Sequence, residues 1–401
     1  MPTVHPVATP PAPGDPSAPA VGAATALLDA YRPGARFLAT PTRTLLADGV
    51  RTVVPTGDSP LADRVRAALA DAVRDGDPWP VVMGAVPFDH EAPAALVVPA
   101  SVHDGPPLGT DPLVALDPTA PVTGGWSVTP VPRPEEYAGG VAAAVRRMRA
   151  GELDKVVLSR TLELLSPEPL DLPSMLGRLA RRDPGGYTFA LPTGPGRTLL
   201  GASPELLVSR RGNRFVANPL AGSTPRSADL AEDVLRAATL LRSEKDLHEH
   251  GVVVDAVRRA MAPYCSELHV PERPTLVRTA TMWHLSTTVT AVADDPELCA
   301  LGMATALHPT PAVCGTPTDT ARRVIEETEP FDRGFFTGVV GWQDASGDGE
   351  WVVTIRCAEA QDRRLRLFAG AGVVAGSDPE AETAETAAKF RTFLQAVGAE
   401  L

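Results

Sequence analysis

The chain has 401 residues, of which 44% are hydrophobic and 21% charged, a balance typical of a globular protein with a large core. Its formal net charge of −12 argues against nucleic acid or an anionic membrane as the main partner. No run of about 18 apolar residues predicts a transmembrane helix, so no membrane partner is expected. The four cysteines are widely spaced without a CxxC pair, which disfavours a structural zinc site or a disulfide framework.

The N-terminal part is predicted to be structural rather than chemical. Residues 1–20 include seven prolines and lack the basic and apolar regions of a signal peptide, so we expect a disordered tail and a cytoplasmic protein. Residues 21–130 carry no chemical motif, and we expect them to complete a sheet and close the site. Apolar runs there predict strands at 36–46, 81–88 and 95–102 and a helix at 63–73.

Stronger patterns occupy residues 131–399, which we expect to form the catalytic part of a single domain over 21–401. Strands and helices follow one another without a regular βαβ rhythm, so the sequence predicts an α+β layered fold. The predicted strands are 155–165, 198–208, 214–220, 351–360 and 364–369, and the predicted helices are 135–150, 229–262 and a last one after residue 377.

Two helix starts are marked by capping residues. Ser243 followed by Asp246 is typical of a cap that begins a new segment within the long helical stretch. The last helix is expected to begin at Ser377 or Asp378, with Pro379 in its first turn. Both helices carry acidic residues close to these starts.

Lysine is rare in this chain. Only three of the 37 basic residues are lysines, namely Lys155, Lys245 and Lys389. Codon bias accounts for the excess of arginine but not for the positions at which lysine survives. An ammonium group can lose its proton and act as a base, whereas a guanidinium practically never does. Each lysine is therefore a candidate for chemistry.

Acidic residues recur on one face of each of two late helices. Asp246 and Glu249 are three residues apart, and Glu382 and Glu385 precede Lys389 on one helical face. A solvated charged face explains either pattern by itself. If the two faces converge, their carboxylates would repel one another unless a cation lies between them. Oxygen ligands completed by water favour Mg²⁺.

Two glycine-containing segments, 220–223 and 369–372, are predicted to be turns whose bare backbone N–H groups can approach an anion. The second segment lacks the last glycine of a dinucleotide-binding motif. Arg356, on a strand shortly before it, could clamp a carboxylate through two parallel hydrogen bonds.

Glu205 stands among apolar residues in the segment 201–207, which is predicted to be a strand. Burial would raise the pKa of its carboxyl group and favour the protonated form that a general acid requires. A buried structural glutamate is the alternative.

Taken together, nine segments resemble the chorismate-utilising enzymes, and most closely the isochorismate synthases of siderophore pathways. The resemblance runs almost continuously from residue 135 to residue 397 and is weak before residue 130. It implies a fold in which two large antiparallel sheets pack together with helices outside. The matching segments are KVVLSR (155–160), GASPELL (201–207), NPLAGSTPR (218–226), SEKDLHEH (243–250), MWHL (282–285), HPTPAVCG (308–315), EPFDRGFFTGVVGW (329–342), GEWVVTIRCA (349–358) and LFAGAGVV (367–374).

The resemblance implies a reaction and its acid and base. Lys155 matches the general base that takes a proton from the water attacking C2 of chorismate. Glu205 matches the general acid that protonates the departing C4 hydroxyl group. The product would be isochorismate, formed reversibly.

The resemblance also implies a magnesium ion that binds the ring carboxylate of chorismate. Glu249 and Glu385 match its protein ligands. Asp246 and Glu382 would hold water molecules bound to the ion.

Substrate binding is implied at nine positions. Arg356, Lys389 and the backbone near Gly372 would bind the enolpyruvyl carboxylate. The remaining implied contacts are Ala221, Gly222 and Ser223 on the opposite wall, His284 nearby, and Ala312 and Val313 beside the enolpyruvyl arm.

Two positions separate the reactions within the family. Anthranilate and aminodeoxychorismate synthases usually carry glutamine where this chain has Lys155, and aminodeoxychorismate synthases carry a nucleophilic lysine at the position of Ala221. Neither pattern is present, so we expect no glutamine amidotransferase subunit, and the resemblance favours a monomer.

Salicylate synthases share Lys155 and Glu205 and remain the alternative, although the segment 308–315 is more similar to isochorismate synthases. A non-catalytic protein on this fold is a third reading, which the intact acid, base and metal ligands disfavour. The sequence leaves the downstream pathway open between siderophore, menaquinone and antibiotic synthesis.

Overall fold

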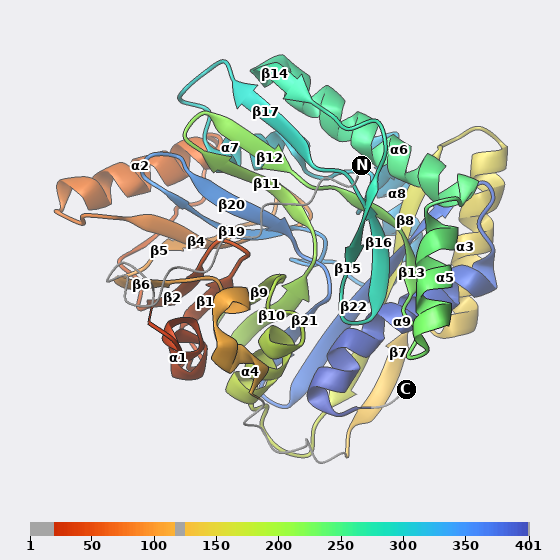
Figure 1. Ribbon diagram of the computed structural model, residues 1–401, viewed down its shortest axis with the longest axis horizontal. Helices are drawn as coiled ribbons and strands as arrows, with labels where there is room; N and C mark the ends of the chain where they lie inside the picture. The colour runs from red at the N-terminus through yellow and green to blue at the C-terminus, as the bar shows by residue number, and fades with distance from the viewer. Residues whose placement is uncertain (1–19, 117–124, 400–401) are drawn as a thin grey trace.

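The computed structural model describes residues 20–116 and 125–399, so all of the predicted tail except Ala20 lies outside the described residues. The strands form two large sheets and a third small one, and every strand pair in them is antiparallel (Figure 1). No helix of the described part is long and apolar enough to cross a membrane.

The first large sheet has ten strands, and its longest ladder pairs Lys155–Leu165 with Arg364–Val374 over their whole length. In spatial order the strands are β18 (Gly315–Thr316), β8 (Lys155–Leu165), β22 (Arg364–Val374), β21 (Cys357–Gln361), β10 (Arg197–Ser203), β9 (Tyr187–Gly194), β1 (Arg36–Ala39), β2 (Thr44–Asp48) and β6 (Ser101–Gly105), with β7 (Ser127–Val131) also paired to β8.

The second large sheet has nine strands and the third sheet has three. The second runs β14 (Cys265–His269), β17 (Val289–Ala293), β12 (Arg214–Ala217), β11 (Leu206–Arg211), β20 (Gly349–Val353), β19 (Val339–Asp344), β4 (Val81–Val86), β5 (Ala95–Val98) and β3 (Thr52–Val53). The third runs β13 (Leu220–Pro225), β16 (Met282–Ser286) and β15 (Thr275–Arg278).

The two large sheets pack face to face through apolar side chains. Phe189 and Leu199 of the first sheet share a buried cluster with Val340, Trp342 and Val352 of the second. Separate apolar clusters join the outer face of each sheet to helices, which therefore lie outside. The helices are α1 (Ala23–Ala30), α2 (Leu61–Arg74), α3 (Pro134–Arg149), α4 (Leu172–Arg182), α5 (Leu230–Leu240), α6 (Glu244–Met261), α7 (Ala300–Leu307), α8 (Thr318–Thr328) and α9 (Pro379–Val397). The predicted α+β fold with two large antiparallel sheets is confirmed.

The chain crosses between the large sheets at two adjacent places. The predicted strand 198–208 is in fact two strands, β10 and β11, which lie in different sheets. Pro204, which cannot donate to a ladder, lies at the break between them. The predicted strand 351–360 likewise divides into β20 and β21. The two crossovers are bonded to each other, since the Ser203 hydroxyl donates to the Val353 carbonyl (2.7 Å) and the Ala202 N–H donates to the Arg356 carbonyl (3.1 Å).

Some of the other predicted boundaries are confirmed and some are wrong. The strand at 155–165 is confirmed as β8, and Ser243 and Asp378 cap α6 and α9 through their side chains. The segment 36–46 is a hairpin of β1 and β2 rather than one strand, and 95–102 divides into β5 and β6 in different sheets. Each half of these segments contains strand-forming residues. The division therefore becomes visible only in the way the two halves pair.

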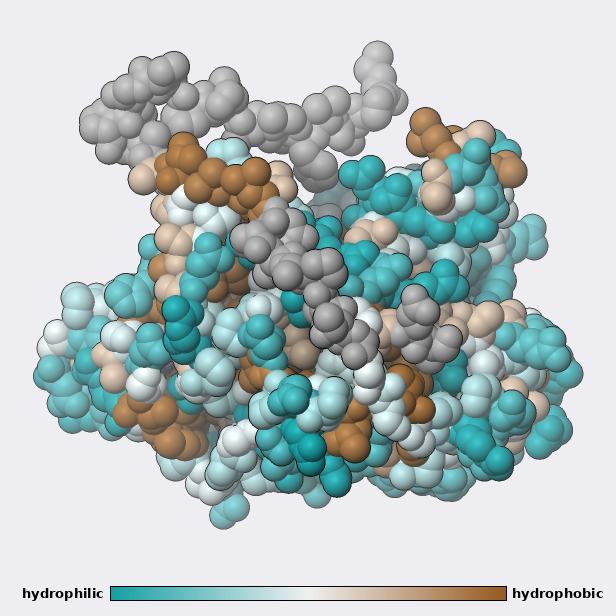
Figure 2. Space-filling model, turned by 90° about the horizontal axis from the view of Figure 1, so that it is seen from below, coloured by the Kyte–Doolittle hydropathy of each residue, from teal (hydrophilic) through white to brown (hydrophobic). Residues whose placement is uncertain are grey.

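The surface seen in Figure 2 is mostly hydrophilic, with apolar side chains in separate small groups. The exposed apolar residues of the described part include Leu230, Val234 and Leu235 on α5. The large apolar surfaces are otherwise inside, between sheets and under helices.

Candidate active site

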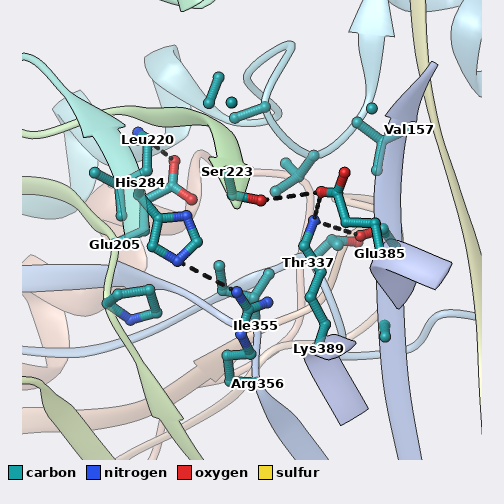
Figure 3. A pocket seen from close by; sticks show the side chains of 18 of the residues that line it. Val157, Glu205, Leu220, Ser223, His284, Thr337, Ile355, Arg356, Glu385 and Lys389 are labelled. Carbon is teal, nitrogen blue, oxygen red and sulfur yellow. Dashed lines mark hydrogen bonds and ion pairs between the residues drawn. The ribbon is translucent and has the colours of Figure 1, made fainter. Parts of the chain in front are cut away.

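A cavity lies where the two crossovers meet the third sheet, α6 and α9 (Figure 3). Twelve of the fifteen predicted site residues line it: Glu205, Ala221, Gly222, Ser223, Glu249, His284, Ala312, Val313, Arg356, Gly372, Glu385 and Lys389. Lys155, Asp246 and Glu382 are not part of the lining. All lining residues follow residue 156, and the described part of 21–130 adds strands to both large sheets but no residue to this lining.

Each lysine of the chain pairs with a carboxylate in this region. The nitrogen–oxygen distances are 2.8 Å for Lys155 and Glu249, 3.0 Å for Lys245 and Glu382, and 2.6 Å for Lys389 and Glu385. Because Lys245 belongs to α6 and Glu382 to α9, the acidic faces of these helices do converge. Lys245, which was not among the predicted site residues, therefore lies beside the cavity.

The carboxyl groups of this cluster differ in their electrostatics. Burial raises the pKa of Glu385, but the ammonium groups of Lys389 and Lys245 and the hydroxyl of Ser223 outweigh burial and hold that pKa below its usual value. Burial and the charge of Glu385 raise the pKa of Glu382. The carboxyl that faces the cavity is thus held in the ionised form, which is the form that binds cations.

Glu205 follows Pro204 at the first crossover and is almost fully buried. The Leu220 N–H donates to its Oε1 at 3.4 Å (Figure 3). Burial raises its pKa to about 7, although this N–H and the charges of Lys155 and Arg356 act to lower it. Glu205 can therefore carry a proton near neutral pH and deliver it into the cavity.

Arg356 occupies the second crossover with a φ of 50°, a conformation that side-chain-bearing residues rarely adopt. Its Nη2 lies 3.4 Å from Nε2 of His284. Burial and the charge of Arg356 hold the pKa of His284 well below its usual value, so the ring is neutral. Since an arginine can only donate, His284 accepts at Nε2 and carries its proton on Nδ1.

The segment 369–372 was predicted to be a turn, and this is wrong. It lies inside β22, where Gly370 pairs with Ser159 and Gly372 with Val157. A side chain at Gly372 would collide with Oε1 of Glu249 and would lie 3.1 Å from Cε of Lys155. The missing side chain leaves room for the Lys155–Glu249 pair. The other predicted turn, 220–223, belongs to β13, which is irregular there and has Gly222 at a φ of 77°.

An apolar wall was missed by the sequence reasoning. Phe336 and Phe368 line the cavity and stack with ring centroids 4.9 Å apart. Thr337 also lines it, with a positive φ of 60°. These residues fall within the matched segments 329–342 and 367–374, but no spacing rule brings a loop residue and a strand residue of such separation together.

The cavity offers oxygen ligands to a cation from two helices. Glu249 on α6 and Glu385 on α9 both present carboxylates to it. Within the described residues, no group of three or more His, Cys, Asp or Glu side chains is arranged to hold a metal ion. Mg²⁺ commonly takes only one or two carboxylates and completes its shell with water and substrate oxygens. The donor set therefore fits magnesium better than zinc.

Three comparisons with known proteins agree with this geometry. The family of chorismate binding enzymes matches residues 119–398. The chain is 55% identical to the isochorismate synthase DhbC of Bacillus subtilis (strain 168) over 383 residues, which cover 93% of this chain and 96% of the relative. It is 44% identical to the vibriobactin-specific isochorismate synthase of Vibrio cholerae serotype O1 over 370 residues, 91% of this chain and 92% of the relative.

A solved structure extends the likeness to three dimensions. The crystal structure from Bacillus anthracis, named for a 2,3-dihydroxybenzoate-specific isochorismate synthase, matches with a TM-score of 0.88 at 47% identity. The match covers 94% of this chain and 100% of that chain. With a family match that spans the whole cavity and relatives aligned over nearly their full length, the chain belongs to the chorismate-binding enzyme family.

Proposed function

We propose that the protein is an isochorismate synthase that converts chorismate reversibly to isochorismate and supplies siderophore or related biosynthesis. One observation carries the proposal. The buried carboxyl of Glu205, which can be protonated, and the carboxylate of Glu249, which is paired with Lys155, line the same cavity. Relatives of 44% and 55% identity that bear this activity in their names support it over salicylate synthesis.

Lys155 would act as the base that takes a proton from water as its oxygen attacks C2. Its side chain is 1% exposed, and its ammonium group is held by Glu249 Oε1 at 2.8 Å. Gly372 lines the cavity, and a side chain there would come within 3.1 Å of Lys155 Cε, so the missing side chain would leave room for a water molecule near the lysine. Glu205 would give its proton to the C4 hydroxyl, which leaves as water.

Substrate anions would be bound at both ends of the cavity. Arg356 and Lys389 would bind the enolpyruvyl carboxylate, with the backbone at Gly372 beside them. Lys389 is already aimed by its bonds to Glu385 and to the Gly370 carbonyl, 2.9 Å away. Because the Lys389 ammonium group is already held in place, it loses little conformational freedom when it binds the substrate carboxylate.

Glu249 and Glu385 would hold a magnesium ion, with Asp246 and Glu382 binding its water molecules. When bound, the ion would neutralise the ring carboxylate of the substrate. Glu382 is held by Lys245, which keeps this buried carboxylate paired.

We further propose a cytoplasmic monomer that works without a glutamine amidotransferase subunit. Ala221 lines the cavity where ammonia-using aminodeoxychorismate synthases carry a nucleophilic lysine. Lys155 likewise replaces the glutamine usual in those enzymes.

Product analysis tests the function. With chorismate and Mg²⁺ the protein should produce an equilibrium mixture of chorismate and isochorismate with little pyruvate, measured by chromatography and by a lactate dehydrogenase coupled assay. Pyruvate in stoichiometric amounts, with salicylate fluorescence appearing at the same rate, would make the protein a salicylate synthase instead.

Replacement of the base tests Lys155. Lys155→Ala should lower kcat by about 10² to 10⁴-fold while chorismate still binds, because the lysine acts on water rather than on substrate. Lys155→Arg is the matched variant: it keeps a positive charge beside Glu249 but cannot serve as a base, so it should be equally slow. Turnover and chorismate binding by calorimetry are the measurements. Near-normal turnover in either variant would remove Lys155 from the mechanism.

The pH dependence tests Glu205. The forward reaction needs the protonated carboxyl, so kcat/KM for chorismate should fall as the pH rises through about 7. Glu205→Gln should slow both directions together, since the reverse reaction uses the same group as a base. Glu359→Gln is the control, because burial also raises the pKa of Glu359 but that residue lies outside the cavity. An intact reverse reaction in Glu205→Gln would contradict the assignment.

Metal dependence tests the two acidic faces. Activity should be lost in excess EDTA and restored by Mg²⁺. Glu249→Gln and Glu385→Gln should each weaken Mg²⁺ binding by at least about tenfold in calorimetry, whereas Glu326→Gln on the exposed face of α8 should not. Equal effects of all three substitutions would mean that no cation lies between the helices.

A further inference from the structure

Arg333 does not line the cavity, yet it is bonded to three separate segments of the cavity wall. It lies between α8 and β19 and is 3% exposed. Its Nη1 donates to the Val313 carbonyl at 2.8 Å and to the Thr337 hydroxyl at 3.3 Å. Its Nη2 donates to the Val157 carbonyl at 2.7 Å. Val157, Val313 and Thr337 all line the cavity.

The charge of Arg333 is balanced by Glu329. The guanidinium binds this buried carboxylate through Nε at 2.8 Å and Nη2 at 2.5 Å. Glu329 also accepts the backbone N–H of Ser159 at 2.7 Å. The pair therefore joins the loop before β19 to the middle of β8, the strand that begins with Lys155.

The guanidinium also packs on aromatic rings behind the wall. It lies 4.8 Å from the ring centroid of Phe88 and 5.8 Å from that of Phe336. Phe336 in turn stacks on Phe368, and both of these rings face the cavity. Arg333 thus supports the apolar wall as well as the backbone around it.

We propose that Arg333 is a positioning residue that holds the wall at Val313 still and so determines whether isochorismate leaves intact or loses pyruvate. The proposal rests on the proposed function. Loss of pyruvate requires hydrogen to pass from C2 of isochorismate to the methylene carbon of the enolpyruvyl arm. The C3–O bond breaks in the same step, which leaves salicylate and pyruvate without any added reactant. A wall that cannot shift denies the arm this folded geometry.

An arginine is needed for these contacts because of its number of donors. The guanidinium has five N–H groups in a fixed plane, whereas a lysine has three on one nitrogen. Lysine at position 333 could stay paired with Glu329 but could not also reach both the Val157 and the Val313 carbonyls. Loss of one buried hydrogen bond lets the Val313 segment move while the charge balance survives.

A matched control exists elsewhere in the chain. Arg210 is likewise buried, and it donates to the carbonyls of Ser346 (2.7 Å) and Pro296 (2.9 Å) and pairs with Asp348 (3.0 Å). None of these residues lines the cavity. Arg210→Lys should therefore lose stability as Arg333→Lys does, without any effect on the products.

The test is the ratio of pyruvate to isochorismate formed by the full-length enzyme from chorismate and Mg²⁺, together with the melting temperature. We expect Arg333→Lys to raise the ratio about tenfold, the factor that results if the free energy of one buried hydrogen bond is removed from the barrier to pyruvate loss. Arg210→Lys should leave the ratio at the wild-type value. A lower melting temperature in both variants with an unchanged ratio in both would overturn the proposal.

Ser159→Ala keeps the proposal testable if Arg333→Lys does not fold. Ser159 lies outside the cavity lining, and its hydroxyl accepts from Nη2 of Arg333 at 3.2 Å. This variant should raise the ratio in the same direction by a smaller factor, and an unchanged ratio would again overturn the proposal. Failure of the wild-type enzyme to form isochorismate would refute the proposed function itself, which is a different outcome.

Discussion

The site depends on the mutual bonding of two chain crossovers between the large sheets. A strand that leaves one sheet for another must give up its ladder, and the freed backbone groups need new partners. Here the crossovers satisfy each other: the Val353 N–H donates to the Glu205 carbonyl at 3.0 Å, and the Ala202 N–H donates to the Arg356 carbonyl at 3.1 Å. Because of this reciprocal bonding, the positions of Glu205 and Arg356 are fixed relative to each other by backbone rather than by flexible side chains.

Charge balance is the second constraint. A carboxylate buried without a partner costs several kcal/mol, and this site buries several of them. Lysine ammonium groups from β8 and α9 meet Glu249 and Glu385, so the fold tolerates the acidic cavity. A cation bound by Glu249 would share that carboxylate with Lys155. In the proposed mechanism, metal binding and the freedom of the Lys155 amine would therefore be coupled through one carboxylate.

Local rules predicted part of this arrangement. The cap at Ser243, the strand that begins at Lys155 and the burial of Glu205 follow from neighbouring residues, and the structure has all three. Local rules could not show that the chain changes sheets after Pro204, because a proline marks the break of a strand but not its new partner. The glycines at 369–372 were misplaced in a turn for a similar reason, since pairing with β8 is a long-range property. Local rules could not point to Arg333, because its bonds to the Val157 and Val313 carbonyls and its contact with Phe88 join segments that are far apart in the sequence.

Because lysine is scarce, amine-directed reagents can modify few side chains of this protein. Only three lysine side chains exist, with exposed fractions of 1% for Lys155, 14% for Lys389 and 40% for Lys245. An acylating dye or cross-linker, apart from the chain's own terminal amine, thus meets one accessible side chain. That side chain contacts Glu382 at 3.0 Å, so a label attached there would sit beside the acidic cluster and sense its occupancy. Attachment to amine-reactive surfaces through this side chain would for the same reason fasten the protein beside its acidic cluster, whereas arginine- or carboxyl-directed chemistry would spread over the outside.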